Sequence, residues 1–171
     1  PVNYYGRTKL AGENALREFD FLDWAIVRTV LLYGTAKDLE RSNVVLWMID
    51  QLSNGEPIHV VNDQWRTPTY VRDLADGLVR LIDREKTGIY HLSGREIVTI
   101  HELAETVAEV FGFARSLIEP VPSDYFEDAV DRPAKTGFII LKAETELGYD
   151  PPSLEEGLRA VGQELGLSSP S

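Results

Sequence analysis

The chain opens with PVNYYGRTKLAGE (residues 1–13), which places Tyr5 four residues before Lys9. Four-residue spacing puts both side chains on one face of a helix, and the apolar residues between positions 10 and 19 recur at helical spacing. A lysine ammonium beside a phenol favours the phenolate and so brings the phenol closer to acid–base chemistry at neutral pH. Proton exchange with a hydroxyl or carbonyl oxygen of a substrate then becomes feasible.

The same spacing recurs at Tyr33 and Lys37, so the motif alone is weak evidence and its context decides. Tyr33 ends an apolar, strand-like run over residues 24–32 and precedes Gly34, which places this second pair in a turn or loop. We therefore expect Tyr5 and Lys9 to carry the chemistry. The structural alternative is a Tyr5 ring packed on a helix face with Lys9 in solvent.

Hydrophobic patterning predicts helices and strands in alternation. Besides the helix that begins near Tyr5, helices are expected over residues 43–52, 71–84, 100–111 and 154–165, and strands over residues 24–32, 58–61 and 89–92. Strands that alternate with helices favour a parallel sheet, so the expected fold class is α/β.

Composition excludes several kinds of partner. The formal net charge of -11 and the pI near 4.7 disfavour nucleic acid and anionic membrane surfaces. The chain has no cysteine and therefore no disulfide or thiolate metal site, and its three histidines lack metal-ligand spacing, so no metal is expected. No apolar run is long enough to suggest a membrane span.

Five segments, taken together and in this order, resemble the extended short-chain dehydrogenase/reductase superfamily, which includes the NAD-dependent epimerases and dehydratases. The most similar branch is the dTDP-4-dehydrorhamnose reductase-like one. The segments are residues 1–13, 27–34, 60–75, 88–94 and 131–133, and the last of them contains an Arg-Pro turn. The resemblance covers almost the whole chain.

The resemblance implies the C-terminal part of a Rossmann-type, doubly wound parallel sheet interwoven with a small α/β substrate-binding lobe. Residues 1–35 and 71–93 would belong to the nucleotide-binding lobe, and residues 36–70 and 94–171 mainly to the substrate-binding lobe. The glycine-rich dinucleotide fingerprint of such enzymes is absent, because the 13 glycines are scattered singly. The sequence also begins with Pro1, and we therefore expect it to be the C-terminal portion of a longer protein.

The activity that the resemblance implies is NAD(P)-dependent reduction of a 4-keto nucleotide-sugar in the cytoplasm. Tyr5 would donate the proton, and Lys9 would hold the ribose of NAD or NADP and lower the pKa of the phenol. Val30, Leu31 and Leu32 would border the nicotinamide. The expected substrate-binding residues are Asn43, Gln64, Arg66 and Arg132, and the family precedent is a homodimer formed through the helix after Tyr5.

Each of these assignments has a structural alternative. Arg66 and Arg132 would suit a diphosphate, because a guanidinium can bind phosphate oxygens bidentately, but either could instead form a surface salt bridge. Asn43 would look the same as a helix cap. Arg28, in mid-strand, is expected in a structural ion pair.

Two other functions stay open. Val30-Leu31 stands where the reductases carry Ser-Trp, and Arg66 together with residues 70–73 resembles the epimerases and dehydratases, so a nucleotide-sugar epimerase or dehydratase is one alternative. The other is a noncatalytic NAD(P)-binding or regulatory subunit. An intact Tyr5 and Lys9 argue against this second alternative.

Overall fold

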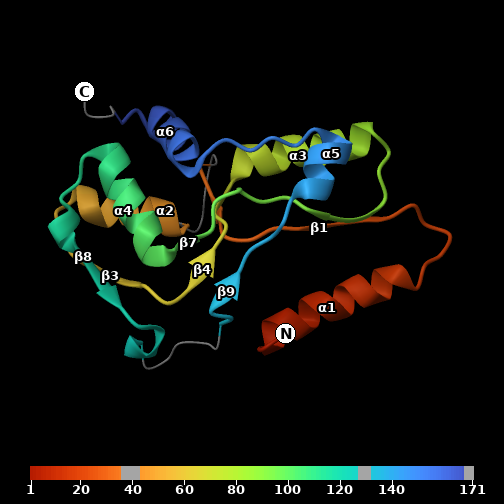
Figure 1. The fold of residues 1–171 in the computed structure, drawn as a ribbon, viewed down its shortest axis with the longest axis horizontal. Coiled ribbons are helices and arrows are strands. Elements are labelled where there is room, and N and C mark those ends of the chain that lie inside the picture. Colours follow the sequence, from red (N-terminus) through yellow and green to blue (C-terminus); the bar gives the residue numbers. More distant parts are fainter. Residues whose placement is uncertain (36–42, 127–131, 168–171) are drawn as a thin grey trace.

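The computed structural model describes residues 1–35, 43–126 and 132–167, and these gather around two hydrophobic clusters at opposite ends of the molecule (Figure 1). Within these ranges, every strand pair is parallel except one, so the predicted α/β fold with parallel strands is confirmed. None of the described helices is long and apolar enough to cross a membrane.

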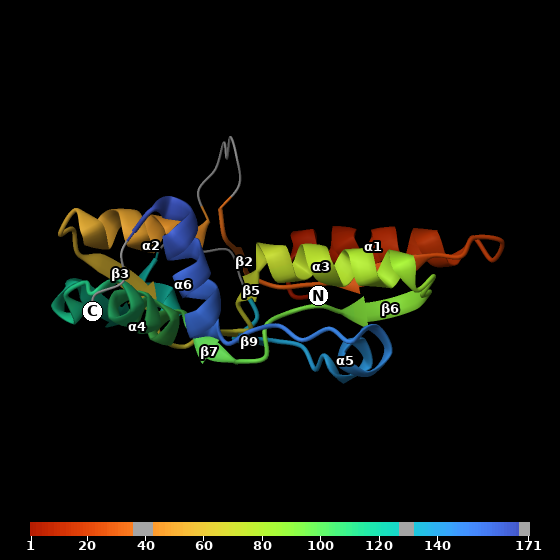
Figure 2. The same ribbon diagram turned by 90° about the horizontal axis from the view of Figure 1, so that it is seen from above.

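The first cluster forms around the parallel pair of β1 (Ala25–Arg28) and β6 (Gly88–His91). Helix α3 (Val71–Asp83) and the short α5 (Leu141–Leu147) pack on this pair, and Figure 2 shows α5 on the side of β6 away from α1. The buried residues of this cluster are Leu81, Tyr90, Leu92, Ile140, Ala143, Leu147 and Tyr149. Residues 140–149 thus return, late in the chain, to the elements formed by residues 25–92.

The second cluster contains α2 (Val44–Ser53), α4 (Ile100–Phe111) and α6 (Leu154–Leu165), packed with the parallel pair of β3 (Ile58–Val61) and β8 (Ile118–Val121). Two of these helices begin with a capping box, Thr99 with Glu102 and Ser153 with Glu156. The predicted bounds of these three helices agree with the structure within about a residue, because caps and hydrophobic period agree locally.

The predicted single strand over residues 24–32 is wrong, because the chain bends between two short strands. β1 ends at Arg28, and β2 (Leu32–Tyr33) follows only after Leu31, whose φ of 46° is unusual for a residue with a branched side chain. β2 pairs with β5 (Thr69–Tyr70), and the bend is held by Thr69, whose amide donates to the Leu31 carbonyl (3.0 Å) and whose hydroxyl donates to the Val30 carbonyl (2.9 Å). The apolar run therefore passes from one cluster to the other.

A small mixed sheet lies in the middle of the molecule. β4 (Trp65–Arg66) pairs with β7 (Val98–Thr99) in antiparallel and with β9 (Lys135–Thr136) in parallel orientation. The 3₁₀ turns η1 (Arg115–Leu117) and η2 (Ser123–Tyr125) flank β8. Strands of two residues carry no periodicity, so none of these was predicted; they matter because they bring Arg66 beside Thr136.

Glu164, near the end of α6, links this helix to the segments that carry β2 and β5. Its carboxylate accepts hydrogen bonds from the Thr35 hydroxyl and from the Tyr70 hydroxyl (2.5 Å), and it forms an ion pair with Arg72 (2.5 Å). Burial opposes ionisation, but these donors outweigh it and hold the pKa of Glu164 below its ordinary value.

The assignment of the two clusters to a nucleotide lobe and a substrate lobe stays a prediction.

Asp73, in the first turn of α3, predicts an unusual pH dependence of stability. Burial, and secondly repulsion by Asp76, raise the pKa of Asp73 from 3.8 to about 6. The folded protein therefore keeps a proton that the unfolded chain releases, and this carboxyl makes stability fall as pH rises from about 4 to about 6. The helix N-terminus offsets part of the penalty.

We expect Asp73→Asn to raise stability at pH 7 by about 1–2 kcal/mol and to flatten the fall in Tm between pH 4 and 6. Thermal unfolding across this pH range measures both effects, with Asp20→Asn, at an exposed position, as the control for loss of one negative charge. If the Asp73→Asn protein keeps the wild-type slope in that window, another group causes it.

Candidate functional site

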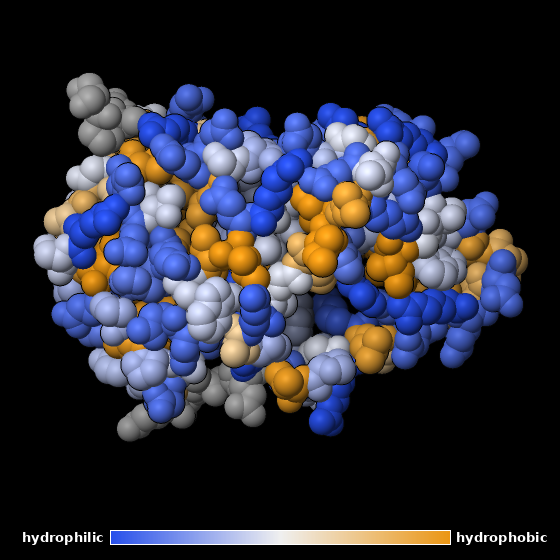
Figure 3. Space-filling view, viewed as in Figure 1, coloured by the Kyte–Doolittle hydropathy of each residue, from blue (hydrophilic) through white to orange (hydrophobic). Residues whose placement is uncertain are grey.

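A cavity of about 370 Å³ brings together residues from distant parts of the chain. It is lined by Asn3, Tyr5, Arg66, Arg132, Pro133 and Thr136. In the space-filling view a hollow opens in the middle of this face, between the start of α1 (Tyr4–Arg17) and the β9 segment (Figure 3). The cavity therefore unites the predicted proton donor with both predicted phosphate-binding arginines.

Tyr5 and Lys9 lie at the start of α1, as the sequence predicted. Asn3 caps the helix by accepting a hydrogen bond from the Gly6 amide (2.9 Å). The Tyr5 side chain is not packed: the residue is 68% exposed, and the Lys9 Nζ lies 5.4 Å from the centroid of its ring. The phenol is accessible to a ligand, with an ammonium beside it.

Arg66 is buried, and protein groups fix its guanidinium. Nη1 donates to the carbonyl oxygens of Trp65 (2.7 Å) and Ala134 (3.3 Å), and Nη2 donates to Gln64 Oε1 (2.8 Å). Burial, and then the nearby charge of Arg132, lower the pKa of Arg66 from its ordinary value. Within the ranges that the structure describes, Arg66 has no ion pair with a carboxylate, so a surface salt bridge does not account for it.

A buried guanidinium next to a second cation favours an anionic ligand, because bringing in negative charge relieves both the burial penalty and the repulsion. Arg132 is the exposed member of the pair and lies on the cavity wall. Gln64 accepts a hydrogen bond from Arg66 and does not line the cavity. Its contact with substrate stays a prediction. Asp131, which precedes Arg132 in the quoted turn, lies outside the described residues.

Asn43 serves as the N-cap of α2. Its Oδ1 accepts hydrogen bonds from the amides of Val45 (3.2 Å) and Leu46 (3.1 Å), and its Nδ2 donates to the Gly34 carbonyl (2.8 Å). The capping interpretation is confirmed, and Asn43 does not line the cavity. A contact with substrate stays a prediction. Lys37, the partner of Tyr33 in the second motif, lies outside the described residues.

Val30, Leu31 and Leu32 form the bend between β1 and β2 and do not line the cavity either. The left-handed φ of Leu31 is the kind of local strain that concentrates at ligand sites. Contact with a nicotinamide stays a prediction for all three. Pro133, in the predicted Arg-Pro turn, lines the cavity. Sequence reasoning missed Thr69, which holds the bend, and Thr136, which lines the cavity, because no local pattern marks them.

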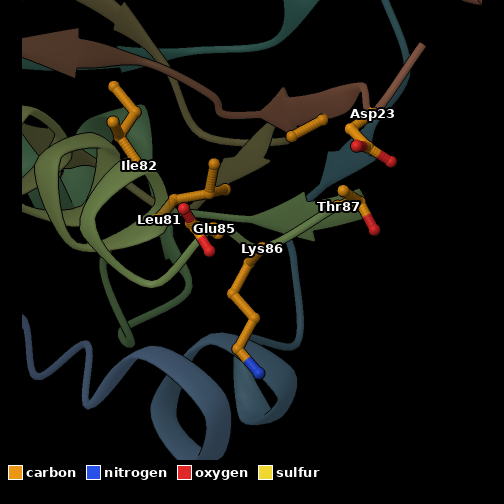
Figure 4. Close-up of a pocket in the computed structure, with 7 residues that line it drawn as sticks. Asp23, Leu81, Ile82, Glu85, Lys86 and Thr87 are labelled. Carbon is orange, nitrogen blue, oxygen red and sulfur yellow. The ribbon is translucent and has the colours of Figure 1, made fainter.

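Two other cavities lack this combination of groups. One of about 830 Å³ lies where α3 ends and β1 and β6 begin, and Figure 4 shows Leu81, Ile82 and Glu85 on its α3 side. The other, of about 530 Å³, lies beside Arg72, Asp73 and Glu164. No predicted site residue lines either cavity. Within the described ranges, no group of three or more histidine or acidic side chains is placed to hold a metal ion.

Comparison with known proteins adds independent evidence. A family model described as the RmlD substrate binding domain matches residues 1–166. A dTDP-4-keto-6-deoxy-D-glucose reductase of Streptomyces niveus is 35% identical over 136 residues, covering 80% of this chain and 46% of that protein. The methionine adenosyltransferase 2 subunit beta of Bos taurus is also 35% identical, over 127 residues, covering 71% of this chain and 37% of that protein.

Among solved structures, the dTDP-4-dehydrorhamnose reductase of Bacillus anthracis, in complex with NADP, matches with a TM-score of 0.83 and 34% sequence identity. The match covers 96% of this chain and 56% of that one. The chain spans about half the length of the first curated relatives that it matches.

Proposed function

The chain belongs to the RmlD substrate-binding domain family, and from this premise we propose that the protein is an NAD(P)-dependent reductase of a 4-keto nucleotide-sugar. The membership confirms the predicted resemblance to dTDP-4-dehydrorhamnose reductases. The observation that carries the proposal is the cavity in which an exposed tyrosine, Tyr5, meets Arg66 and Arg132.

The side chains of α1 fit the nicotinamide end of the cofactor. The accessible phenol of Tyr5 lines the cavity, and the Lys9 ammonium lies 5.4 Å from the centroid of its ring. The two groups are the donors that ribose hydroxyls and a reacting carbonyl need. No glycine-rich turn for the pyrophosphate occurs in the sequence, so Tyr5, Lys9 and the bend at residues 30–32 are the groups that this chain would offer. When bound, NAD(P)H supplies the hydride that reduces the ketone carbon.

Tyr5 donates its phenolic proton to the ketone oxygen, and the product carries a hydroxyl there. The positive charge of Lys9 stabilises the phenolate that remains. Arg66 and Arg132 bind the diphosphate of the substrate and so place the sugar beside Tyr5. Arg66 is suited to this because its carbonyl and amide partners hold the guanidinium before substrate arrives.

Turnover by the complete gene product tests the proposal. We expect a dTDP-4-keto-6-deoxy sugar to oxidise NADH or NADPH with one equivalent of 4-hydroxy product, while the matching 4-hydroxy sugar nucleotide leaves the reduced cofactor unchanged. Conversion to an isomer without net cofactor consumption would support the epimerase alternative. If the cofactor and the keto sugar both bind but no reaction follows, both the reductase proposal and the epimerase alternative are contradicted.

A noncatalytic subunit is the second candidate, and the similarity to a methionine adenosyltransferase subunit beta favours it. The discriminating observation is binding without turnover: a protein that binds dinucleotide but reduces no 4-keto sugar would fit this candidate.

The homodimer expected from the family would use α1, which leaves Leu10 and, just beyond its end, Phe19 exposed. This assembly is part of the proposal.

A further inference from the structure

Helix α1 carries the proposed proton donor, yet nothing on it is buried. In the part of the chain that the structure describes, the side-chain hydrogen bonds and ion pairs that leave this helix all run from Glu13 to Arg28 on β1. In Figure 1 the helix lies at the lower edge of the molecule, below β1. In the described residues, the ion pair of Glu13 with Arg28 therefore links α1 directly to β1.

The contact is bidentate and well shielded. Arg28 Nε donates to Glu13 Oε1 (2.8 Å) and Arg28 Nη2 to Glu13 Oε2 (2.5 Å), while Arg17 of the same helix donates to Oε2 (2.9 Å). The Glu13 side chain is only 17% exposed. The hydrogen bond from Arg28 lowers the pKa of Glu13 against the opposing effect of burial, so the carboxylate stays charged at neutral pH.

The anchor on β1 is itself held rigidly. Arg28 is in register with His91 of β6, and its carbonyl accepts a hydrogen bond from the Leu92 amide (3.0 Å). The His91 ring packs against Phe138, with 4.4 Å between the centroids. The guanidinium therefore extends from a fixed backbone, and a two-bond contact to it restricts both the tilt and the rotation of α1.

Helix geometry connects this contact to the cavity. Residues 5, 9 and 13 differ by about 40° for each four-residue step, so Tyr5, Lys9 and Glu13 lie within an arc of about 80° on one side of α1. At a radius of about 6 Å, a rotation of the helix by about 10° moves a side-chain atom by about 1 Å. A displacement of this size is enough to cost about 100-fold in rate.

We propose that Glu13 and Arg28 are positioning residues, whose ion pair sets the rotation of α1 and thereby places Tyr5 and Lys9 for proton transfer. The proposal rests on the proposed reductase function. It predicts a loss that acts through Tyr5 and not through general stability.

The test combines Glu13→Gln, which keeps size and helix propensity, with Tyr5→Phe in the complete gene product. Alone, Glu13→Gln should lower kcat about 10- to 100-fold, and Arg28→Lys, which loses the fork geometry, should do the same. In the Tyr5→Phe background, Glu13→Gln should cause no further loss, because the group that it positions is absent. Arg17→Ala, which removes only the two bonds within α1, to Glu13 and Asn14, is the matched control and should keep wild-type kcat.

Hydrogen exchange gives a readout that does not depend on turnover. Amides of residues 4–12 should exchange faster in Glu13→Gln and Arg28→Lys than in wild type or Arg17→Ala, while amides of α4 stay unchanged. Equal losses of kcat from Glu13→Gln in both backgrounds would show a structural role and overturn the inference, as would wild-type kcat with unchanged exchange. If Tyr5→Phe alone keeps full activity, the proposed function fails instead, whatever the exchange data show.

Discussion

Tyr5→Phe is expected to lower kcat for reduction of a 4-keto nucleotide-sugar by about 10²- to 10⁴-fold, the contribution typical of a positioned general acid. The substitution removes one hydroxyl from a side chain that is 68% exposed, so the fold should be unaffected. Steady-state kinetics and a thermal melt of the same sample measure the two effects. Binding of NAD(P)H should persist, because Lys9 and the rest of α1 remain.

Tyr4→Phe provides the matched control. Tyr4 is adjacent to Tyr5 and 81% exposed, yet it does not line the cavity. Its substitution should leave kcat unchanged. Retained turnover in Tyr5→Phe, or an equal loss in both variants, would remove Tyr5 from the role of acid.

Arg66→Ala is expected to raise KM for the nucleotide-sugar about 10- to 100-fold, the value of one or two charge-assisted hydrogen bonds to phosphate. Binding of the dinucleotide should stay within a factor of two or so of wild type, because the assigned cofactor residues lie on α1 and the β1–β2 bend. Isothermal titration with each ligand separates the two effects. A parallel loss of both affinities would contradict the assignment of Arg66 to the sugar nucleotide.

Stability has to be followed in the same experiment. Removing the Arg66 side chain leaves Gln64 Oε1 without its donor, at a cost of about 1–3 kcal/mol, whereas the carbonyl of Ala134 keeps the hydrogen bond from the Trp65 amide (2.7 Å). Arg66→Lys keeps the charge but loses the fork, so it should restore stability more than affinity. Arg115→Ala, which breaks an exposed ion pair with Glu109, is the control for loss of one positive charge.

The predictability of the fold depends on where its signals lie. The helices at residues 44–53, 100–111 and 154–165 were predicted because each has a cap and an apolar stripe within its own segment. By contrast, α5 has seven residues and no side-chain cap, and β4, β7 and β9 have two residues each. Such elements form only because tertiary neighbours supply their hydrogen bonds and burial.

The site divides in the same way. The pair Tyr5 and Lys9 and its helix follow from local spacing, and Arg28 was expected in an ion pair because a charge in mid-strand needs a partner. The identity of that partner, Glu13, could not be predicted, because residues 13 and 28 meet only when α1 lies against β1. For Asn43, the sequence did not distinguish a helix cap from a substrate-binding residue. Only the hydrogen bonds from the α2 amides identify it as the cap.

The sequence by itself determined the α/β class, the helix with Tyr5 and Lys9 on one face, and the family, because these depend on spacing within short segments. Only the tertiary structure decided that the run 24–32 bends at Leu31, that Arg66 is buried between carbonyl oxygens, and that Arg132 shares its cavity with Tyr5. These outcomes depend on contacts between residues about 40 to 130 positions apart in the chain. Local propensities do not predict such contacts, because the free energy of burying a charge or forming a cavity depends on how several elements pack together.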